Sequence, residues 1–220
     1  MNILVIAAHP DDEVLGVGGT IAKLAKQGHG VDILIVTEGC TSQYPDRPEM
    51  IAQKQREARR AGELLGARNV LFGSLPDMKL DTLASTEVTK CIEKVVRDRK
   101  PQWVFTQAEH DINLDHRIVY AATMVACRPY STPWIERIYT YYTPSSSEWG
   151  TKHFEANTYC DIRDTIEAKV KAMTAYESEV RPLPHPRNPE MLCNIAAYFG
   201  STVGLHFVEP FCLIRDSRLL

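Results

Sequence analysis

The first half of the chain alternates short apolar runs, rich in β-branched residues, with longer stretches whose apolar residues follow helical spacing. This alternation is typical of a parallel sheet covered by helices on both faces. The apolar runs predict strands at residues 3–8, 31–37, 70–72 and 103–106. The helical spacing predicts one helix that includes Ile21 and ends at Gly28, and further helices at residues 49–65, 88–96 and 118–125.

The second half has a less regular pattern. It predicts a strand at residues 135–142, a helix at 162–176 and a closing strand at about 207–214. Four prolines between residues 181 and 189 exclude a regular helix and a central strand, so we expect a rigid, ordered loop there. Asn188 is placed to cap a final helix that runs to about Ser201.

These elements predict an α/β, Rossmann-like fold with a mostly parallel sheet and helices on both faces. The length of 220 residues fits a single domain over residues 1–220. In this domain, residues 130–220 add loops, helices and the closing strand.

The charge and the cysteines narrow the classes of protein that fit. A net charge of −3 gives no basic field for a polyanion, so we expect no nucleic-acid partner. The N-terminal apolar run meets acidic residues before it could form a signal peptide or cross a bilayer, so we expect a cytoplasmic protein without a membrane span. The six cysteines are dispersed without a CxxC pair, so any metal is expected on nitrogen and oxygen ligands. Homo-oligomerisation is left open.

Two polar clusters directly follow predicted strands. AHPDDE, at residues 8–13, comes after the first strand, and HDINLDHR, at residues 110–117, comes after the fourth. Ligands of open α/β sheets gather beyond the carboxyl ends of the strands. The two clusters are therefore the candidate site.

The residue types in these clusters point to a catalytic metal. His9 and Asp12 lie three residues apart at a strand-to-helix turn and can converge on one point, where His116 can supply a third ligand. Two imidazoles and a carboxylate with an open position are typical of catalytic zinc, which lowers the pKa of bound water toward roughly 7 and polarises a carbonyl. Asp11 is the predicted general base, because it adjoins two ligands without being forced to coordinate. Asp115 is predicted to orient a ligand imidazole.

The AHPDDE and HDINLDHR motifs resemble those of the PIG-L or LmbE-like deacetylase family. The resemblance covers most of the chain and includes TEG at residues 37–39, Arg56-Glu57, Pro76-Asp77 and the segment 176–190 with its PHPR. It implies an LmbE-like fold and a zinc enzyme, with Fe²⁺ or another divalent metal as the alternative, that removes the N-acetyl group from an N-acetylglucosamine-type small molecule. It also implies His9, Asp12 and His116 as metal ligands and Asp11 as general base.

The resemblance further implies that Arg56 and Asp77 contact the sugar. Some relatives carry a histidine three residues before the last ligand, where this chain has Asn113. The sequence therefore leaves open which group stabilises the oxyanion and which protonates the leaving amine. His110 and His185 are the candidates, and we favour His185 because its loop concentrates His and Arg at the expected rim of the site.

Two further residues are candidates for substrate contact. Arg187, in the same proline-rich loop as His185, is expected to bind substrate. Trp149 follows residues 145–148 in a predicted loop, where it either stacks on a sugar ring or anchors the loop.

Two alternatives to the amino-sugar deacetylase stay open. One is an amidase that acts on a sugar–thiol conjugate. The other is a non-catalytic, Rossmann-like module for a nucleotide or nucleotide sugar, in which the aspartates of the first cluster only cap a helix. The enzyme hypothesis predicts about one tightly held zinc per chain, which a chelator removes together with the activity.

Overall fold

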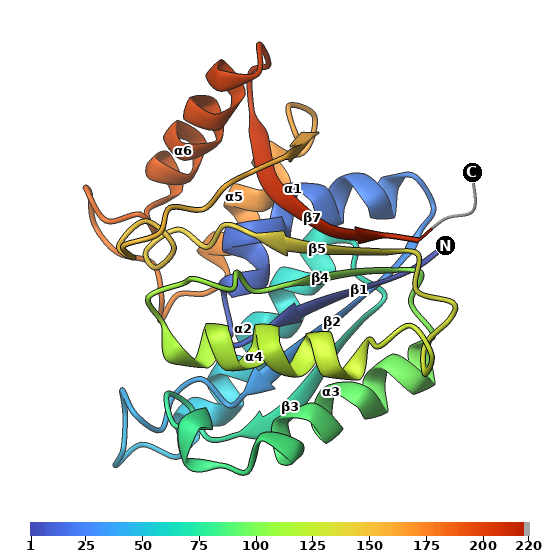
Figure 1. Cartoon of the computed structure of the whole chain (residues 1–220). Coiled ribbons are helices and arrows are strands. Elements are labelled where there is room, and N and C mark those ends of the chain that lie inside the picture. The colour runs from blue at the N-terminus through green and yellow to red at the C-terminus, as the bar shows by residue number, and fades with distance from the viewer. Residues whose placement is uncertain (218–220) are drawn as a thin grey trace.

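Seven strands form one mixed sheet in the computed structural model, which describes residues 1–217 (Figure 1). Their bounds are β1 Asn2–Ala7, β2 Gly30–Thr37, β3 Asn69–Leu75, β4 Trp103–Thr106, β5 Arg137–Tyr141, β6 Thr158–Asp161 and β7 Val208–Asp216. The strand order is β3-β2-β1-β4-β5-β7-β6. The first five strands in this order are parallel, and β7 runs antiparallel to β5 and β6. The predicted α/β fold with a mostly parallel sheet is confirmed.

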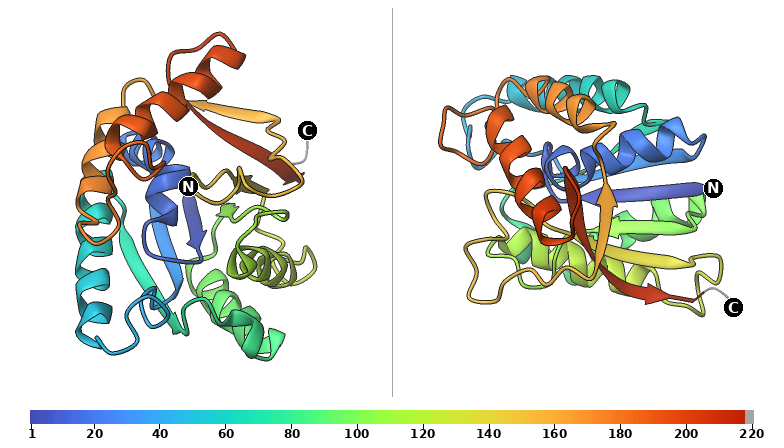
Figure 2. Two further views of the ribbon diagram at one scale, coloured as in Figure 1. Left: turned by 90° about the vertical axis from the view of Figure 1, so that its left-hand side faces the viewer. Right: turned by 90° about the horizontal axis from the view of Figure 1, so that it is seen from above.

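Helices cover both faces of the sheet (Figure 2). Their bounds are α1 Asp12–Lys26, α2 Glu49–Leu65, α3 Ser85–Arg99, α4 Leu114–Ala126, α5 Ile166–Thr174 and α6 Pro189–Thr202, with a short 3-10 turn, η1, at Leu80–Thr82. Apolar residues of α1, α2 and α5 pack with alternate strand residues such as Val5 and Ile33. The intervening residues, such as Leu4 and Leu34, pack with α3 and α4 on the opposite face. The runs of strand residues are apolar on both faces for this reason.

The structure departs from the predicted elements mainly in the second half. The helix predicted at 162–176 spans only Ile166–Thr174, because the backbone N–H of Ile162 donates to Phe207 O (2.9 Å) and so extends the pairing of β6 with the β7 side. The strand β6 was not predicted, because the sequence TYCD of this four-residue edge strand carries no alternating pattern. The cap at Asn188 is confirmed, since its side chain accepts a hydrogen bond from Glu190 N at 2.9 Å.

All of these strands belong to one sheet, and the single domain over residues 1–220 stays a prediction. None of the helices in residues 1–217 combines the length and the apolar character that a membrane crossing requires.

A buried ion pair ties β7 and α5 to the middle of α1. Glu209 Oε1 lies 2.6 Å from Lys169 Nζ, and the Glu209 carboxylate also accepts hydrogen bonds from the backbone N–H groups of Gly19 (2.9 Å) and Thr20 (2.7 Å). Lys169 Nζ donates to Leu15 O at 2.7 Å. Both charged side chains are buried. The pair therefore fixes α1, whose first turn contributes to the candidate site, against the C-terminal part of the fold.

Replacing Glu209 by Gln is expected to lower the free energy of unfolding by about 3–5 kcal/mol, because the charge of Lys169 then stays buried without its counter-ion. Urea denaturation measures the change. Glu63→Gln is the matched control, since Glu63 pairs with Arg60 at the surface, and its expected effect is within about 1 kcal/mol. Similar losses of unfolding free energy in the two variants would show that the buried pair contributes no more to stability than the surface pair.

Candidate metal centre and active site

The candidate site lies at the carboxyl ends of β1 and β4, which are neighbours at the centre of the sheet. His9 follows β1, Asp12 opens α1, and His116 lies in the first turn of α4. Asp11, between the first two, has a φ of 108°. Residues other than glycine rarely adopt this backbone conformation, and strained residues of this kind are enriched at functional sites.

Three side chains from these two segments meet at one point. His9 Nδ1 lies 3.2 Å from His116 Nε2 and 3.4 Å from Asp12 Oδ2, and His116 Nε2 lies 3.2 Å from the same Asp12 oxygen. One ligand atom from each residue falls within 4.8 Å of the other two. The structure thus brings the three predicted metal ligands together.

Further polar groups orient each of these donors. The second ring nitrogen of His9 lies 3.2 Å from Asp115 Oδ2, and that of His116 lies 3.3 Å from Asp111 Oδ1. Gln107 Nε2 and the backbone N–H of His9 both donate to Asp12 Oδ2 at 2.8 Å. Carboxylates that hold the far nitrogen of an imidazole are typical of metal centres. Asp115 was predicted to contact a ligand imidazole, whereas Asp111 was not singled out.

The charges of the cluster suit a divalent cation. Burial by itself would lower the pKa of His9, but its hydrogen bonds to Asp115 and Asp12 raise it to about 10. Burial is likewise outweighed at His116, whose pKa rises to about 9 beside Asp12 and Asp111. Burial would raise the pKa of Asp12, yet the neighbouring charge of His116 holds it far below its usual range. The carboxylates thus favour positive charge here, and a cation can take the place of the two protons.

The carboxyl group of Asp11 is buried beside the ligands. Its Oδ2 accepts no hydrogen bond from residues 1–217, and Arg187 Nε lies 3.4 Å away. Burial raises the pKa of Asp11, while the charge of Arg187 opposes the rise. The backbone N–H of Asp11 donates to Glu13 Oε2 (3.2 Å), and Glu13 Oε1 accepts a hydrogen bond from Tyr176 (2.6 Å). This support from α1 and from the turn after α5 was not predicted.

Asp77 also reaches the site. Its Oδ1 lies 3.6 Å from His9 Nε2, and its Oδ2 is buried without a hydrogen bond from the described residues. Its backbone N–H donates to Glu38 Oε1 at 3.2 Å, which joins the loop after β2 to the loop after β3. An acceptor that is buried and unpaired in the protein is suited to a hydroxyl or amide N–H of a ligand.

Arg56 is not brought to the site. It is exposed on α2, and no contact with the metal cluster is present. The buried polar residues of this helix face are Lys54 and Glu57. Lys54 forms an ion pair with Glu179, which is also buried, and neither residue was predicted to support the site. The substrate contact implied for Arg56 therefore stays a prediction that the geometry of α2 does not favour.

The two candidate histidines for the oxyanion lie outside the metal cluster. His110 is exposed, with its Nε2 3.4 Å from Lys152 Nζ and 3.7 Å from Glu109 Oε2. His185 is half-buried, and its Nδ1 accepts a hydrogen bond from the backbone N–H of Arg187 at 3.1 Å. Their assignment stays a prediction.

Trp149 is 60% exposed in the loop between β5 and β6 and makes no stacking contact with another ring of the described residues. Its two alternative roles, at a sugar ring or as an anchor, both stay predictions.

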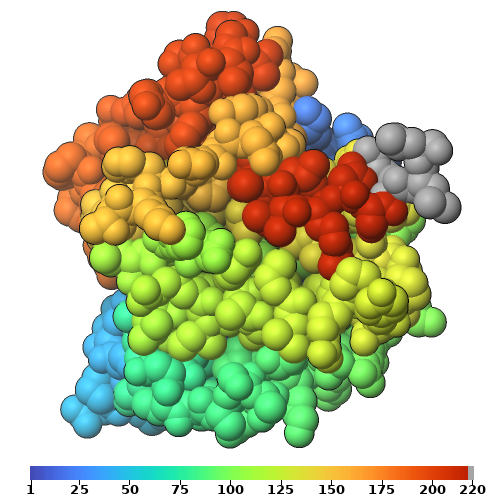
Figure 3. All heavy atoms as spheres, in the orientation of Figure 1, coloured from blue at the N-terminus to red at the C-terminus, as the bar shows by residue number. Residues whose placement is uncertain are grey.

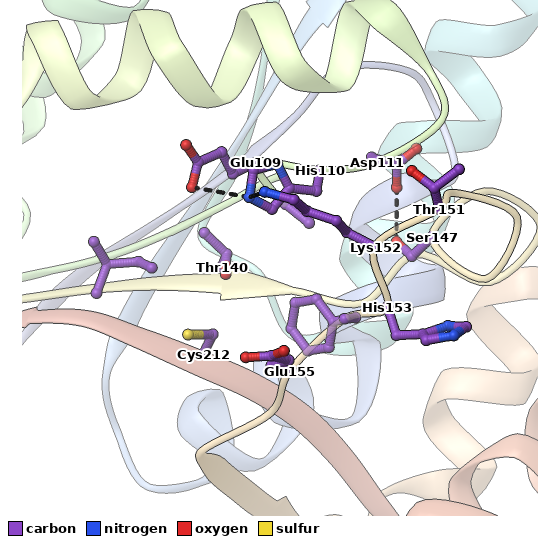
Figure 4. Close-up of a pocket in the computed structure, with 13 residues that line it drawn as sticks. Glu109, His110, Asp111, Thr140, Ser147, Thr151, Lys152, His153, Glu155 and Cys212 are labelled. Atoms are coloured by element: carbon purple, nitrogen blue, oxygen red, sulfur yellow. Dashed lines mark hydrogen bonds and ion pairs between the residues drawn. The ribbon is translucent and has the colours of Figure 1, made fainter.

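A cavity of about 590 Å³ is lined in part by Asp111, whose Oδ1 lies 3.3 Å from His116 Nδ1 (Figure 4). It lies between the loop after β4, strands β5 and β7, and residues 151–155. Figure 3 shows this face of the molecule, on which β7 and α4 are both exposed. His110 and Lys152 line it, and it meets the site only through Asp111 and Ser147. None of the three predicted metal ligands lines this cavity.

The chain is similar to a family model and to several known proteins. The family model for PIG-L, described as GlcNAc-PI de-N-acetylase, matches residues 4–127. The uncharacterized deacetylase YaiS of Escherichia coli (strain K12) is 31% identical over 150 residues, which cover 66% of this chain and 75% of the relative. The diacetylchitobiose deacetylase of Thermococcus kodakarensis is 27% identical over 231 residues, which cover 94% of this chain and 81% of the relative.

A solved structure extends the similarity to the whole fold. The N,N'-diacetylchitobiose deacetylase from Pyrococcus horikoshii, complexed with its inhibitor MPG, superimposes with a TM-score of 0.79 and 26% sequence identity over 97% of this chain and 84% of that one. The family match spans both polar clusters that form the metal centre. The chain therefore belongs to the PIG-L family of de-N-acetylases.

Proposed function

We propose that this protein is a metal-dependent hydrolase that removes the N-acetyl group from an N-acetylglucosamine-type amino sugar or its conjugate and releases acetate. The observation that carries the proposal is the meeting of His9, Asp12 and His116 beside Asp11, whose Oδ2 is buried without a hydrogen bond from residues 1–217. The relatives named as diacetylchitobiose deacetylases support the substrate class.

The metal would be held by His9, Asp12 and His116. Two nitrogen donors and one carboxylate, without sulfur, suit zinc, with Fe²⁺ or another divalent metal as the alternative. When bound, zinc supplies Lewis acidity and makes water easier to deprotonate. Asp115 and Asp111 hold the imidazoles in place through their far nitrogens.

Asp11 acts as general base in this proposal. It takes a proton from water as the water oxygen adds to the acetyl carbonyl carbon, and the carbonyl oxygen gains a negative charge. When the C–N bond breaks, that proton passes to the nitrogen, so acetic acid and a free amine form, and the acid loses its proton to solvent and leaves as acetate. Asp77 accepts a hydrogen bond from the sugar, because its Oδ2 is buried and unpaired among the described residues. The sequence also predicts substrate contacts for Arg56, which the geometry of α2 does not favour, and for Trp149, whose alternative role is to anchor its loop.

A screen for acetate release tests the proposal. The zinc-loaded protein is assayed with N-acetylglucosamine, its nucleotide-activated form, its phosphatidylinositol conjugate and short chitin fragments, and the same panel is run after chelation. We expect release from at least one compound, loss on chelation and recovery with zinc. A panel that includes a sugar–thiol conjugate distinguishes the amidase alternative. A zinc-loaded protein that binds a nucleotide sugar but releases no acetate from any compound would support the binding module instead.

A further inference from the structure

Arg187 is the cation that the structure places next to the base. Its Nε lies 3.4 Å from Asp11 Oδ2 and donates to Ser145 Oγ at 3.2 Å. Its Nη1 pairs with the buried carboxylate of Glu179. The hydrogen bonds and ion pairs of the Arg187 side chain with residues 1–217 involve Nε and Nη1, and none involves Nη2. A guanidinium carries five N–H donors in a planar fork, so Nη2 leaves two of them for a ligand.

Glu179 fixes this guanidinium from the turn after α5. Its two oxygens pair with different cations, Oε2 with Arg187 and Oε1 with Lys54 of α2. The Glu179 and Lys54 side chains are each only 2% exposed, whereas that of Arg187 is 23% exposed. Glu179 thus joins α2 to the proline-rich loop and holds Arg187 where its side chain is still partly exposed.

His110 and His185, the two histidines considered for stabilising the oxyanion, are less suited to that role than Arg187. The charge that develops on the carbonyl oxygen arises one bond from the carbon that the water attacks, and hence close to the base that deprotonates the water. Arg187 is in ion-pair distance of that base, whereas His110 contacts Lys152 and Glu109 instead. Burial and the nearby charges of Arg187 and Arg181 lower the pKa of His185, which favours its uncharged form.

We propose that Arg187 is the catalytic residue that stabilises the oxyanion, and that Glu179 is the positioning residue that holds it there. The inference rests on the proposed hydrolysis of an acetamide. As water adds and its proton moves to Asp11, Nη2 of Arg187 donates to the carbonyl oxygen that takes up the negative charge. When the C–N bond breaks and the amine leaves with the proton, the same guanidinium pairs with the acetate.

The first experiment compares Arg187→Gln with wild type on the compound that the wild type cleaves best in the acetate screen. We expect kcat to fall about 10²–10³-fold with little change in KM, the usual effect of removing one oxyanion donor. The same compound with an N-trifluoroacetyl group has a carbonyl that stabilises its own negative charge. On that substrate the loss is expected to shrink to about tenfold or less.

Chemical rescue gives a second readout. Guanidinium ion added to Arg187→Ala is expected to restore part of kcat in a saturable way, at concentrations that leave the wild type unaffected. A loss that falls wholly in KM, or an equal loss on both acyl groups without rescue, would overturn the catalytic assignment. Arg187→Lys keeps a charge and serves if the other variants do not fold.

Glu179 is tested by Glu179→Gln, with Glu179→Asp as the conservative variant. We expect Gln to lower kcat about tenfold or more at full zinc content, and Asp to recover part of the loss, because only Asp can still pair with the two cations. Arg181→Gln is the matched control, since Arg181 also faces Glu179, at 3.8 Å, but does not reach Asp11. A normal kcat in Glu179→Gln would contradict the positioning role.

The outcome also separates this inference from the function it rests on. If the wild type releases no acetate, the proposed function fails before any variant is compared. If the wild type is active and His185→Ala or His110→Ala loses kcat while Arg187→Gln keeps it, the function stands and the assignment of Arg187 is wrong.

Discussion

The His116→Ala protein is expected to lose both its metal and its activity. His116 Nε2 is one of three ligand atoms and lies within 3.2 Å of both His9 Nδ1 and Asp12 Oδ2. Without this imidazole, two donors remain, and a four-coordinate catalytic zinc needs three protein ligands besides its open position. We expect zinc content to fall from about one per chain to near zero after dialysis, and acetate release to fall to background.

His206→Ala is the matched control, because His206 is an exposed histidine that belongs to no cluster of the site. It should keep the wild-type zinc content and rate. Metal analysis and the acetate assay on the same preparations measure both quantities, and thermal unfolding checks that His116→Ala is folded. Retention of about one zinc per chain in His116→Ala would contradict the ligand set.

The metal centre could be predicted from the sequence because it depends on the order of the strands and polar clusters along the chain. An apolar strand followed by HPDD, and a later strand followed by a second cluster, place His9 and His116 at one sheet edge if the two strands are neighbours. Their Nδ1 and Nε2 atoms lie 3.2 Å apart in the structure. Parallel strands with short connections leave few other arrangements, so this part of the fold was predictable.

The residues that support the site could not be predicted in the same way, because their roles depend on side-chain orientation and long-range packing. Arg56 and Lys54 lie two residues apart on α2, about 200° around the helix from each other, so only one of them can face inward. A motif match could not decide which one, and the structure buries Lys54. Glu179 pairs with Lys54 across more than a hundred positions of sequence, for which no local pattern exists.

The C-terminal strands show the same limit. The strand β7 was predicted from its apolar run, but its place between β5 and β6 was not. The hydrophobic periodicity of a strand does not show which strands it pairs with or in which direction. Within residues 1–217, β6 pairs with β7 alone, and its residues are half-buried or exposed, so it lacks the apolar signal of the central strands.

Asp11→Asn is expected to keep the fold and the metal but to lose most of the rate. Asn matches Asp in shape and tolerates a positive φ better than most residues, so the 108° backbone at this position should persist. The amide cannot take a proton from water, and loss of a general base costs about 10²–10⁴-fold in kcat. Zinc content, thermal unfolding and acetate release are measured on one preparation.

The Asp11→Asn variant tests the mechanism more directly than the loss of a ligand does, because it separates metal binding from the proton transfer that catalysis requires. Asp11 Oδ2 accepts no hydrogen bond from the described residues, so the substitution breaks no contact that holds the metal ligands. The Arg187 guanidinium beside it keeps its pairing with Glu179 in the variant. A zinc-loaded Asp11→Asn protein with near wild-type kcat would therefore mean that another group takes the proton, and the buried Asp11 carboxylate would then be a structural feature of the turn.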